Sequence, residues 1–252
     1  MTDDPNASGT GETFISHLVE LRNRVMKASL AIIVVFLCLM PWAGAIYDLL
    51  AQPMMLALPA GSKMIATGVI TPFLIPVKVT LLLAFMVALP VVLYQAWAFI
   101  APGLYTHEKK LVAPLVISSS LLFLLGVAFC YHFVFGTVFQ FVNNFAPKSI
   151  SVAPDIESYF GFVMTMFIAF GLTFEVPIVV VVLVRMGLVS VEKLKEIRPY
   201  VIVGAFIIAA VVTPPDVVSQ LMLALPLCLL YEVGLLVAPL FARVTQAPEE
   251  TT

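Results

Sequence analysis

The sequence predicts an all-α membrane protein in which six helices cross a bilayer. Of its 252 residues, 62% are hydrophobic and only 11% are charged, whereas soluble domains carry roughly 45–50% apolar and about 25% charged residues. The mean hydropathy is +1.08, and the apolar residues form long runs separated by short polar connections. A chain of this composition is a polytopic membrane protein.

Four apolar runs are long enough to cross a bilayer, which needs about 20 apolar residues within a range of about 17–25. They cover residues 25–46, 73–100, 111–135 and 159–184. The remaining apolar stretch, 200–241, is interrupted by the sequence TPPD at 213–216. Because proline cannot continue a helix, this stretch is expected to form a hairpin of two short helices. Residues 200–212 are short for a full crossing, so either the bilayer thins there or neighbouring helices shield this segment.

Prolines inside the expected spans predict bent helices. Each one removes a backbone donor and tends to kink the helix that contains it. Membrane helices tolerate proline more often than soluble ones do, but five of them together favour a bundle that curves into a concave wall. These prolines are Pro41, Pro90, Pro114, Pro177 and Pro226.

The expected domain plan has one transmembrane domain with a tail at each end. Residues 1–12 are expected to be a disordered tail, 13–241 the six-helix domain and 242–252 a disordered cytoplasmic tail. Acidic residues precede the first apolar run, so we expect that run to stay as a membrane helix and not to act as a cleaved signal peptide. No internal repeat is visible, which argues against the inverted-repeat plan of many transporters.

The basic residues predict the orientation. Of the thirteen Lys and Arg residues, all but Lys63, Lys78 and Lys148 fall on one side of the six-span arrangement. By the positive-inside rule, both termini and the two short basic loops are cytoplasmic. The opposite face carries two longer connections, 47–72 and 136–158, whose prolines predict ordered caps.

Composition and motifs exclude several classes of function. The three cysteines are odd in number and lack a CxxC pair, so they are expected to be buried hydrophobes. The histidines are too dispersed for a metal cluster, and no hydrolase or phosphate-binding signature is present. We therefore expect neither an enzyme nor a metal or other cofactor. A net charge of −2 gives no reason to expect a nucleic-acid partner.

Two glutamates on the cytoplasmic side predict a small acidic site. Glu20 lies in an amphipathic segment before the first span, and Glu108 lies in a loop next to Lys109 and Lys110. Either one alone could be a solvated surface charge, and Glu20 could pair with Arg24 one helical turn away. Two carboxylates on a face dominated by Lys and Arg favour a site for a basic ligand.

Glu175 differs because it lies deep in the fourth span, between Phe174 and Val176. A charged side chain at that depth is costly, so this glutamate is either protonated or faces a polar cavity. The alternative is a single structural hydrogen bond. Asp216 and Gln220 are likewise polar residues in an apolar stretch, at the expected outer end of the last hairpin.

Six motifs, in order along the chain, resemble the TatC family, the multi-spanning subunit of the twin-arginine (Sec-independent) protein translocase. They are FISHLVELRNR at 14–24, YQAWAFIAPGLY at 94–105, the loop around Glu108, AFGLTFEVP at 169–177, RPY at 198–200 and TPPD at 213–216. The similarity runs from about Thr13 to Phe241. The N-terminal dozen residues and the acidic tail lie outside it, and Arg185 matches no motif of the family.

The resemblance implies a receptor for the twin-arginine signal peptides of folded export cargo. Such a receptor would assemble with single-span TatA and TatB proteins, as a homo-oligomer among membrane lipids of the bacterial inner membrane. Transport would be driven by the proton-motive force. The resemblance places Glu20, Glu108 and Arg22 at the signal peptide, Glu175 in an intramembrane cavity, and Thr213, Asp216 and Gln220 against a partner helix.

Two other readings of the residues stay open at this point. A proton-coupled small-molecule transporter could use Glu175 as its proton site, but it leaves the paired surface carboxylates unexplained. A structural scaffold for other membrane subunits would tolerate loss of charge at Glu20 and Glu108. Binding of a twin-arginine peptide in preference to its twin-lysine version separates the translocase from the transporter, and loss of activity on charge removal at Glu20 and Glu108 separates it from the scaffold.

Overall fold

A computed structural model describes residues 7–58, 63–100, 109–145 and 153–241 of the chain. Within these ranges the structure is helical, apart from one isolated β-bridge and short turns. The chain divides into two compact units. The first contains Met1–Tyr47 and Pro76–Ser120, and the second contains Asp48–Ile75 and Leu121–Thr252.

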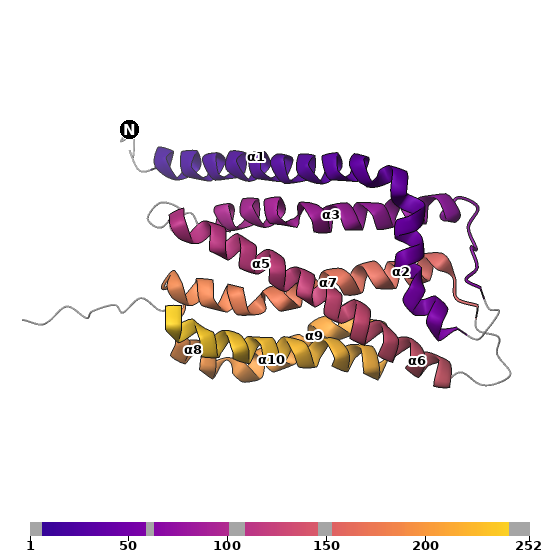
Figure 1. Cartoon of the computed structure of the whole chain (residues 1–252). Coiled ribbons are helices and arrows are strands. Elements are labelled where there is room, and N and C mark those ends of the chain that lie inside the picture. The colour runs from indigo at the N-terminus through magenta and orange to yellow at the C-terminus, as the bar shows by residue number, and fades with distance from the viewer. Residues whose placement is uncertain (1–6, 59–62, 101–108, 146–152, 242–252) are drawn as a thin grey trace, which may run out of the picture. The chain divides into compact units, whose positions relative to one another are not determined.

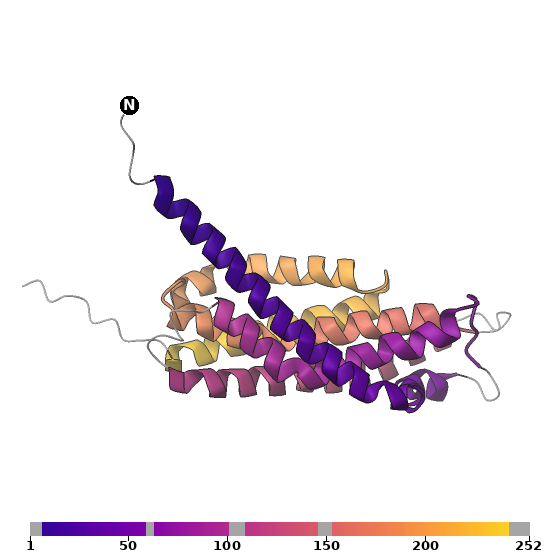
Figure 2. The same ribbon diagram turned by 90° about the horizontal axis from the view of Figure 1, so that it is seen from above.

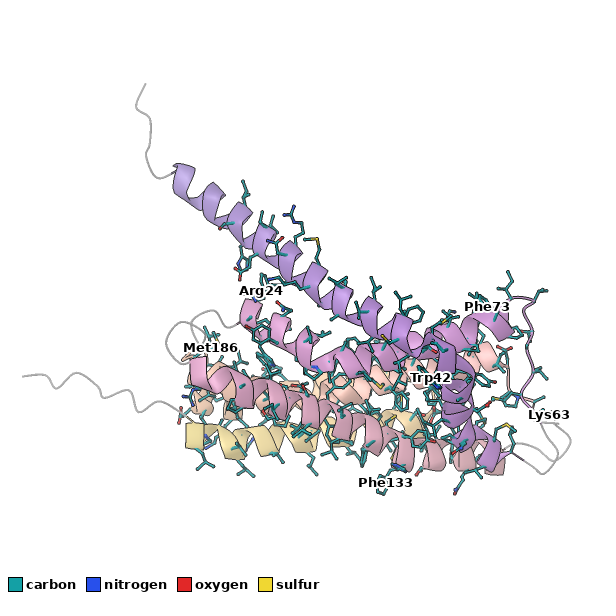
Figure 3. All side chains as sticks on the ribbon, turned by 45° about the horizontal axis from the view of Figure 1, so that its top comes forward. Arg24, Trp42, Lys63, Phe73, Phe133 and Met186 are labelled. Carbon is teal, nitrogen blue, oxygen red and sulfur yellow. The ribbon has the colours of Figure 1, made fainter. Side chains whose placement is uncertain are left out.

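The first unit is built on α1 (Ala7–Leu39), most of α3 (Thr71–Ile100) and the start of α5 (Lys109–Phe129). At 33 residues, α1 is about 50 Å long, and it begins well before the apolar run that predicted it. The amphipathic segment therefore continues the membrane helix without a break. Pro41 lies in a 3₁₀ turn, η1 (Met40–Trp42), directly after α1. Figure 3 labels Arg24 within α1 and Trp42 at this turn.

The second unit contains the start of α3, the end of α5 from Leu121 on, and the remaining helices. The latter are α2 (Ala43–Ala57) from Asp48 on, η2 (Cys130–Val134), α6 (Phe135–Phe145), α7 (Ile156–Arg185), α8 (Val191–Glu196), α9 (Arg198–Val212) and α10 (Val217–Phe241). Here α10 packs along both α7 and α9 (Figures 1 and 2). Val180, Val184, Leu194, Tyr231, Leu235 and Ala238 form a buried cluster between α7, α8 and α10.

Two glycines permit close approach of helices in the second unit. A Cβ added at Gly234 on α10 would lie 3.0 Å from the Cα of Pro177 on α7. One added at Gly171 on α7 would clash with the ring of Phe123 on α5. Small residues at such contacts let membrane helices pack closely by van der Waals forces. These contacts fix the part of α7 that carries Glu175.

The expected number of spans is confirmed. Five segments are long and apolar enough to cross a bilayer, and α9 is a sixth, shorter apolar helix. At 15 residues, α9 is about 22 Å long, less than the roughly 30 Å of a bilayer core. The second helix of the hairpin is longer than expected, because α10 continues through Pro226 and Pro239 for 25 residues.

The two long connections between the expected spans, 47–72 and 136–158, meet in the second unit. The amide of Ile65 donates to Pro154 O at 3.0 Å, and the amide of Ile156 donates to Ile65 O at 2.9 Å. Asp155 caps α7 and accepts hydrogen bonds from the Thr67 hydroxyl at 2.9 Å and the Ser158 amide at 3.1 Å. Figure 3 labels Lys63 and Phe73 at this end of the unit and Met186 at the other.

Candidate functional site

Glu20 lies on the face of α1 that turns toward the rest of the first unit. The half-buried residues of α1 follow a helical period and form one stripe. That stripe comprises Glu20, Arg24, Ala28, Ala31, Ile32, Val35, Phe36 and Leu39. Glu20 therefore continues an apolar packing face toward the N-terminal end of α1 and is not a fully solvated charge.

Arg24 pairs with Glu20 across one helical turn. The Nη2 and Nε atoms of Arg24 donate to Oε1 of Glu20 at 2.5 and 2.9 Å. The side chain of Arg24 is 24% exposed and that of Glu20 is 44% exposed. The i, i+4 pairing weighed in the sequence analysis is thus present. Intrahelical i, i+4 pairs contribute only about 0.3–0.5 kcal/mol, so a ligand can displace this one.

A ring contact joins the start of α1 to the end of α3. The imidazole of His17 stacks on the ring of Phe99, with centroids 4.4 Å apart and planes inclined by 25°. His17 lies three residues before Glu20, on the same side of the helix. Phe99 is the next-to-last residue of α3, and segment 101–108 follows directly. Glu108 lies outside the described residues, so its meeting with Glu20 stays a prediction.

A buried hydrogen bond connects the two helices that flank segment 101–108. The indole Nε1 of Trp97 on α3 donates to the hydroxyl of Ser119 on α5 at 3.0 Å. Both side chains are almost fully buried. A buried indole N–H needs such a partner, and here the bond also fixes α3 against α5.

Arg22 points away from Glu20. Two residues correspond to about 200° around a helix, and Arg22 is exposed and donates to Asn23 Oδ1 at 3.4 Å. Among the described residues, the structure brings Glu20 together with Arg24 and not with Arg22. A role for Arg22 at a signal peptide stays a prediction.

Glu175 is buried inside the second unit. Glu175 is 6% exposed, and its neighbours Phe170 and Thr173 on α7 are also buried. A Cβ added at Gly126 of α5 would lie 2.5 Å from Phe170 O, which shows how closely α5 approaches this part of α7. Glu175 is thus covered by the helices of this unit. The water-accessible cavity that the sequence analysis expects around it stays a prediction.

The turn between α9 and α10 uses two of the three predicted partner-contact residues internally. The buried hydroxyl of Thr213 donates to Ala209 O at 2.9 Å. Asp216 caps α10, because its Oδ1 accepts from the Ser219 amide at 2.7 Å. Gln220 follows one turn later with a half-buried side chain.

The sequence analysis missed two contacts at the other end of this hairpin. Arg198 Nη2 donates to Glu232 Oε2 at 2.7 Å, with both side chains nearly half exposed. Tyr231 donates its hydroxyl to Leu194 O at 2.8 Å. The first of these pairs was within reach of sequence reasoning, because hairpin helices run antiparallel and place the start of α9 opposite the end of α10. The second needed the position of α8.

The sequence matches a known protein family. The family described as Sec-independent protein translocase protein (TatC) matches residues 16–226. The chain is 53% identical over 238 residues to the TatC protein of Halothiobacillus neapolitanus, an alignment that covers 94% of this chain and 65% of that longer protein. It is 51% identical over 223 residues to TatC of Escherichia coli K12, covering 88% of this chain and 86% of that one.

The fold is also similar to that of solved TatC structures. A crystal structure of a twin-arginine translocase receptor TatC matches with a TM-score of 0.79 at 36% identity, covering 90% of this chain and all of that one. The relatives are named as translocase proteins, not as enzymes. This chain is a multi-pass membrane protein and belongs to the TatC family of Sec-independent protein translocase proteins.

Proposed function

We propose that this chain is the twin-arginine signal-peptide receptor and core subunit of a translocase that exports folded proteins under the proton-motive force. The observation that carries the proposal is the placement of Glu20. This carboxylate lies on the inner face of α1, and His17 on the same face contacts the end of α3 that leads to Glu108. The family membership supports the same function.

The chemistry of the ligand fits this carboxylate. A guanidinium donates two parallel hydrogen bonds to a carboxylate, a geometry that an ammonium group does not reproduce. Arg24 already places a guanidinium on Glu20 within the chain, so the site accepts that group. In the proposal, Glu20 and Glu108 each receive one arginine of the signal peptide, and Arg22 contacts the same ligand.

The proposed setting is the bacterial inner membrane, with both termini in the cytoplasm. In the second unit, Lys63 and Met186 lie at opposite ends, as the charge-based orientation requires (Figure 3). The partners would be single-span TatA- and TatB-type proteins, in a complex that contains several copies of this chain. Gln220 would seat a partner helix, while Thr213 and Asp216 hold the turn that presents it. Glu175 would face a water-accessible concavity used during transport.

Equilibrium binding to the purified full chain in detergent tests the receptor function. A fluorescent twin-arginine peptide should bind more tightly than its twin-lysine version. Glu20→Gln should weaken twin-arginine binding by about 1.5–3 kcal/mol, because the neutral amide loses a charge-assisted hydrogen bond. Glu192→Gln, the same change at an exposed carboxylate of α8, serves as the control and should bind normally. Equal affinity of the two peptides for the unaltered chain would rule out the proposal.

A further inference from the structure

We infer that Pro53 makes α2 depend on an attachment to the rest of the second unit, and that Tyr131 provides this attachment. The tyrosine hydroxyl supplies to the Leu49 carbonyl the hydrogen bond that a proline at position 53 cannot donate. Leu49, Pro53 and Tyr131 all belong to the second unit. The inference goes beyond the proposed function, which gives α2 no role.

Pro53 leaves one carbonyl of α2 without its helical donor. In an α-helix each amide donates to the carbonyl four residues earlier, but proline has no N–H and its ring presses against that carbonyl. Pro53 lies inside α2, so the affected carbonyl is that of Leu49. The next residue, Met54, has an amide, so the Leu50 carbonyl keeps a possible helical donor. The sequence thus creates one open acceptor at a defined position of α2.

A tyrosine hydroxyl occupies this acceptor. Tyr131 in η2 donates to Leu49 O at 3.0 Å, and Tyr159 on α7 donates to Leu50 O at 2.8 Å. Membrane helices tolerate proline where neighbouring groups satisfy the freed carbonyl. Two adjacent carbonyls of α2 therefore bond to two separate segments of the second unit. Only the bond from Tyr131 replaces one that the helix has lost.

Aromatic packing holds both tyrosines in place. The ring centroid of Tyr131 lies 6.5 Å from that of Phe167, and the ring centroid of Tyr159 lies 5.5 Å from that of Phe139. Phe135 joins the two pairs, with its centroid 5.2 Å from Phe167 and 5.5 Å from Phe139. Because packing already restricts these rings, the hydroxyls lose little conformational freedom when they bond to α2.

Apolar packing alone holds this part of α2 weakly. Of residues 48–56, only Ala51 is buried, whereas Leu49, Met55 and Leu56 are 54%, 42% and 87% exposed. The two hydrogen bonds from the tyrosines therefore have a large share in holding α2. The proline exchanges a bond within the helix for a bond that fixes the helix to its neighbours.

A double-mutant cycle separates this coupling from a general loss of stability. Tyr131→Phe and Tyr159→Phe each remove one hydroxyl and keep the ring, and Tyr159→Phe is the matched control because its carbonyl partner does not depend on Pro53. Pro53→Ala returns an amide that can bond to Leu49 O. Each substitution, and each tyrosine substitution combined with Pro53→Ala, is made in the full-length chain in detergent. Hydrogen exchange of the α2 amides is followed by mass spectrometry, and peptides from α10 report global unfolding.

Tyr131→Phe should speed exchange in α2 about three- to tenfold in the otherwise unaltered chain, the range that a lost hydrogen bond gives. In the Pro53→Ala background it should speed exchange less than about twofold, since the helix then supplies the donor. Tyr159→Phe should speed exchange by the same factor in both backgrounds. Exchange in α10 should not change in any variant.

Three results would overturn the inference. Tyr131→Phe could leave exchange in α2 unchanged, or speed it equally in the two backgrounds, and its bond would then be unrelated to Pro53. Pro53→Ala could also abolish the effects of both tyrosine substitutions, and the attachment would then depend on the bend in α2 and not on the freed carbonyl. Peptide binding does not enter this test, so its outcome and that of the proposed function are independent.

Discussion

Arg24 directs both of its hydrogen bonds to Glu20 at one oxygen, Oε1, which Nη2 and Nε approach at 2.5 and 2.9 Å. A bidentate arginine ligand needs both oxygens of a carboxylate. Arg24 and an incoming guanidinium therefore compete for Glu20. The receptor holds its carboxylate in a preformed but displaceable ion pair.

Removal of this competitor should strengthen binding. Arg24→Gln is expected to raise twin-arginine peptide affinity about twofold, because a pair of about 0.3–0.5 kcal/mol no longer has to be broken. Lys27→Gln removes the same charge from an exposed position of α1 without touching Glu20, and its effect should be smaller and should vanish at high salt. Weaker binding by Arg24→Gln would instead mean that Arg24 holds Glu20 in its binding orientation.

The contact between Thr67 and the start of α7 should loosen when Asp155 loses its charge. Hydrogen bonds from Ser158 and Thr67 hold the pKa of Asp155 below its usual value. A carboxyl group with a lowered pKa stabilises the fold above its unfolded pKa, about 3.9, and this contribution is lost as the pH falls through the lower folded value. The amides of Thr67 and Ser158 both donate to Asp155, at 3.2 and 3.1 Å, so Asp155→Asn should speed hydrogen exchange at these two amides near neutral pH.

The control for this experiment is Asp48→Asn, an exposed aspartate of α2, which should leave both amides protected. In the unaltered chain, their protection should decline only below about pH 4, while in Asp155→Asn it should not change in that range. Equal protection in the two proteins at neutral pH would show that the charge of Asp155 is dispensable there.

The buried hydrogen bond from Tyr231 to Leu194 O should contribute to stability. Tyr231→Phe removes the hydroxyl that donates to that carbonyl, so the free energy of unfolding should fall by about 0.6 kcal/mol, the average for hydrogen bonds between membrane helices, and by at most about 1.7 kcal/mol. Tyr200→Phe makes the same change at a residue that is 77% exposed and should be neutral. Reversible unfolding in mixed detergent micelles measures both, and equal stability of the two variants would contradict the expectation.

Much of this fold is readable from the sequence because the bilayer imposes it. A membrane core admits only long apolar helices, so run lengths and the break at Pro214 and Pro215 predict the six helices. The start of α1 at Ala7 and the full length of α10 were not predicted. An amphipathic segment can continue a helix, and proline in a membrane helix does not have to end it.

The candidate site is only partly readable in the same way. The glutamates stand out because charge is rare in this chain, and the spacing of Glu20 and Arg24 indicates their pairing directly. The stacking of His17 on Phe99 joins residues 82 positions apart, and the bridge from Ile65 to Asp155 joins others still more distant. Neither contact leaves a periodic signal in the sequence, because each depends on which helices pack together.

Glu175 should matter for transport and not for peptide binding. Glu175→Gln keeps the shape and hydrogen-bonding groups of the side chain, so it should fold, bind the twin-arginine peptide normally and alter transport if charge matters. Glu175→Leu should impair transport more, because it removes the polar group from a buried site. The rate at which cells that carry each variant export a folded cargo measures the effect on transport. A normal export rate with Glu175→Leu would show that the carboxyl group of Glu175 has no role in transport.

A cross-linking map shows directly whether the arginine pair of a signal peptide lies between Glu20 and Glu108. A twin-arginine signal peptide with a photoreactive residue beside its arginine pair is bound to the full-length chain in membranes, irradiated and mapped by mass spectrometry. If Glu20 and Glu108 hold the arginine pair, cross-links should form to the stretch of α1 around Glu20 and to residues 101–108, with few cross-links from the twin-lysine peptide. Cross-links concentrated on α9 or α10, or equal yields from the two peptides, would contradict it.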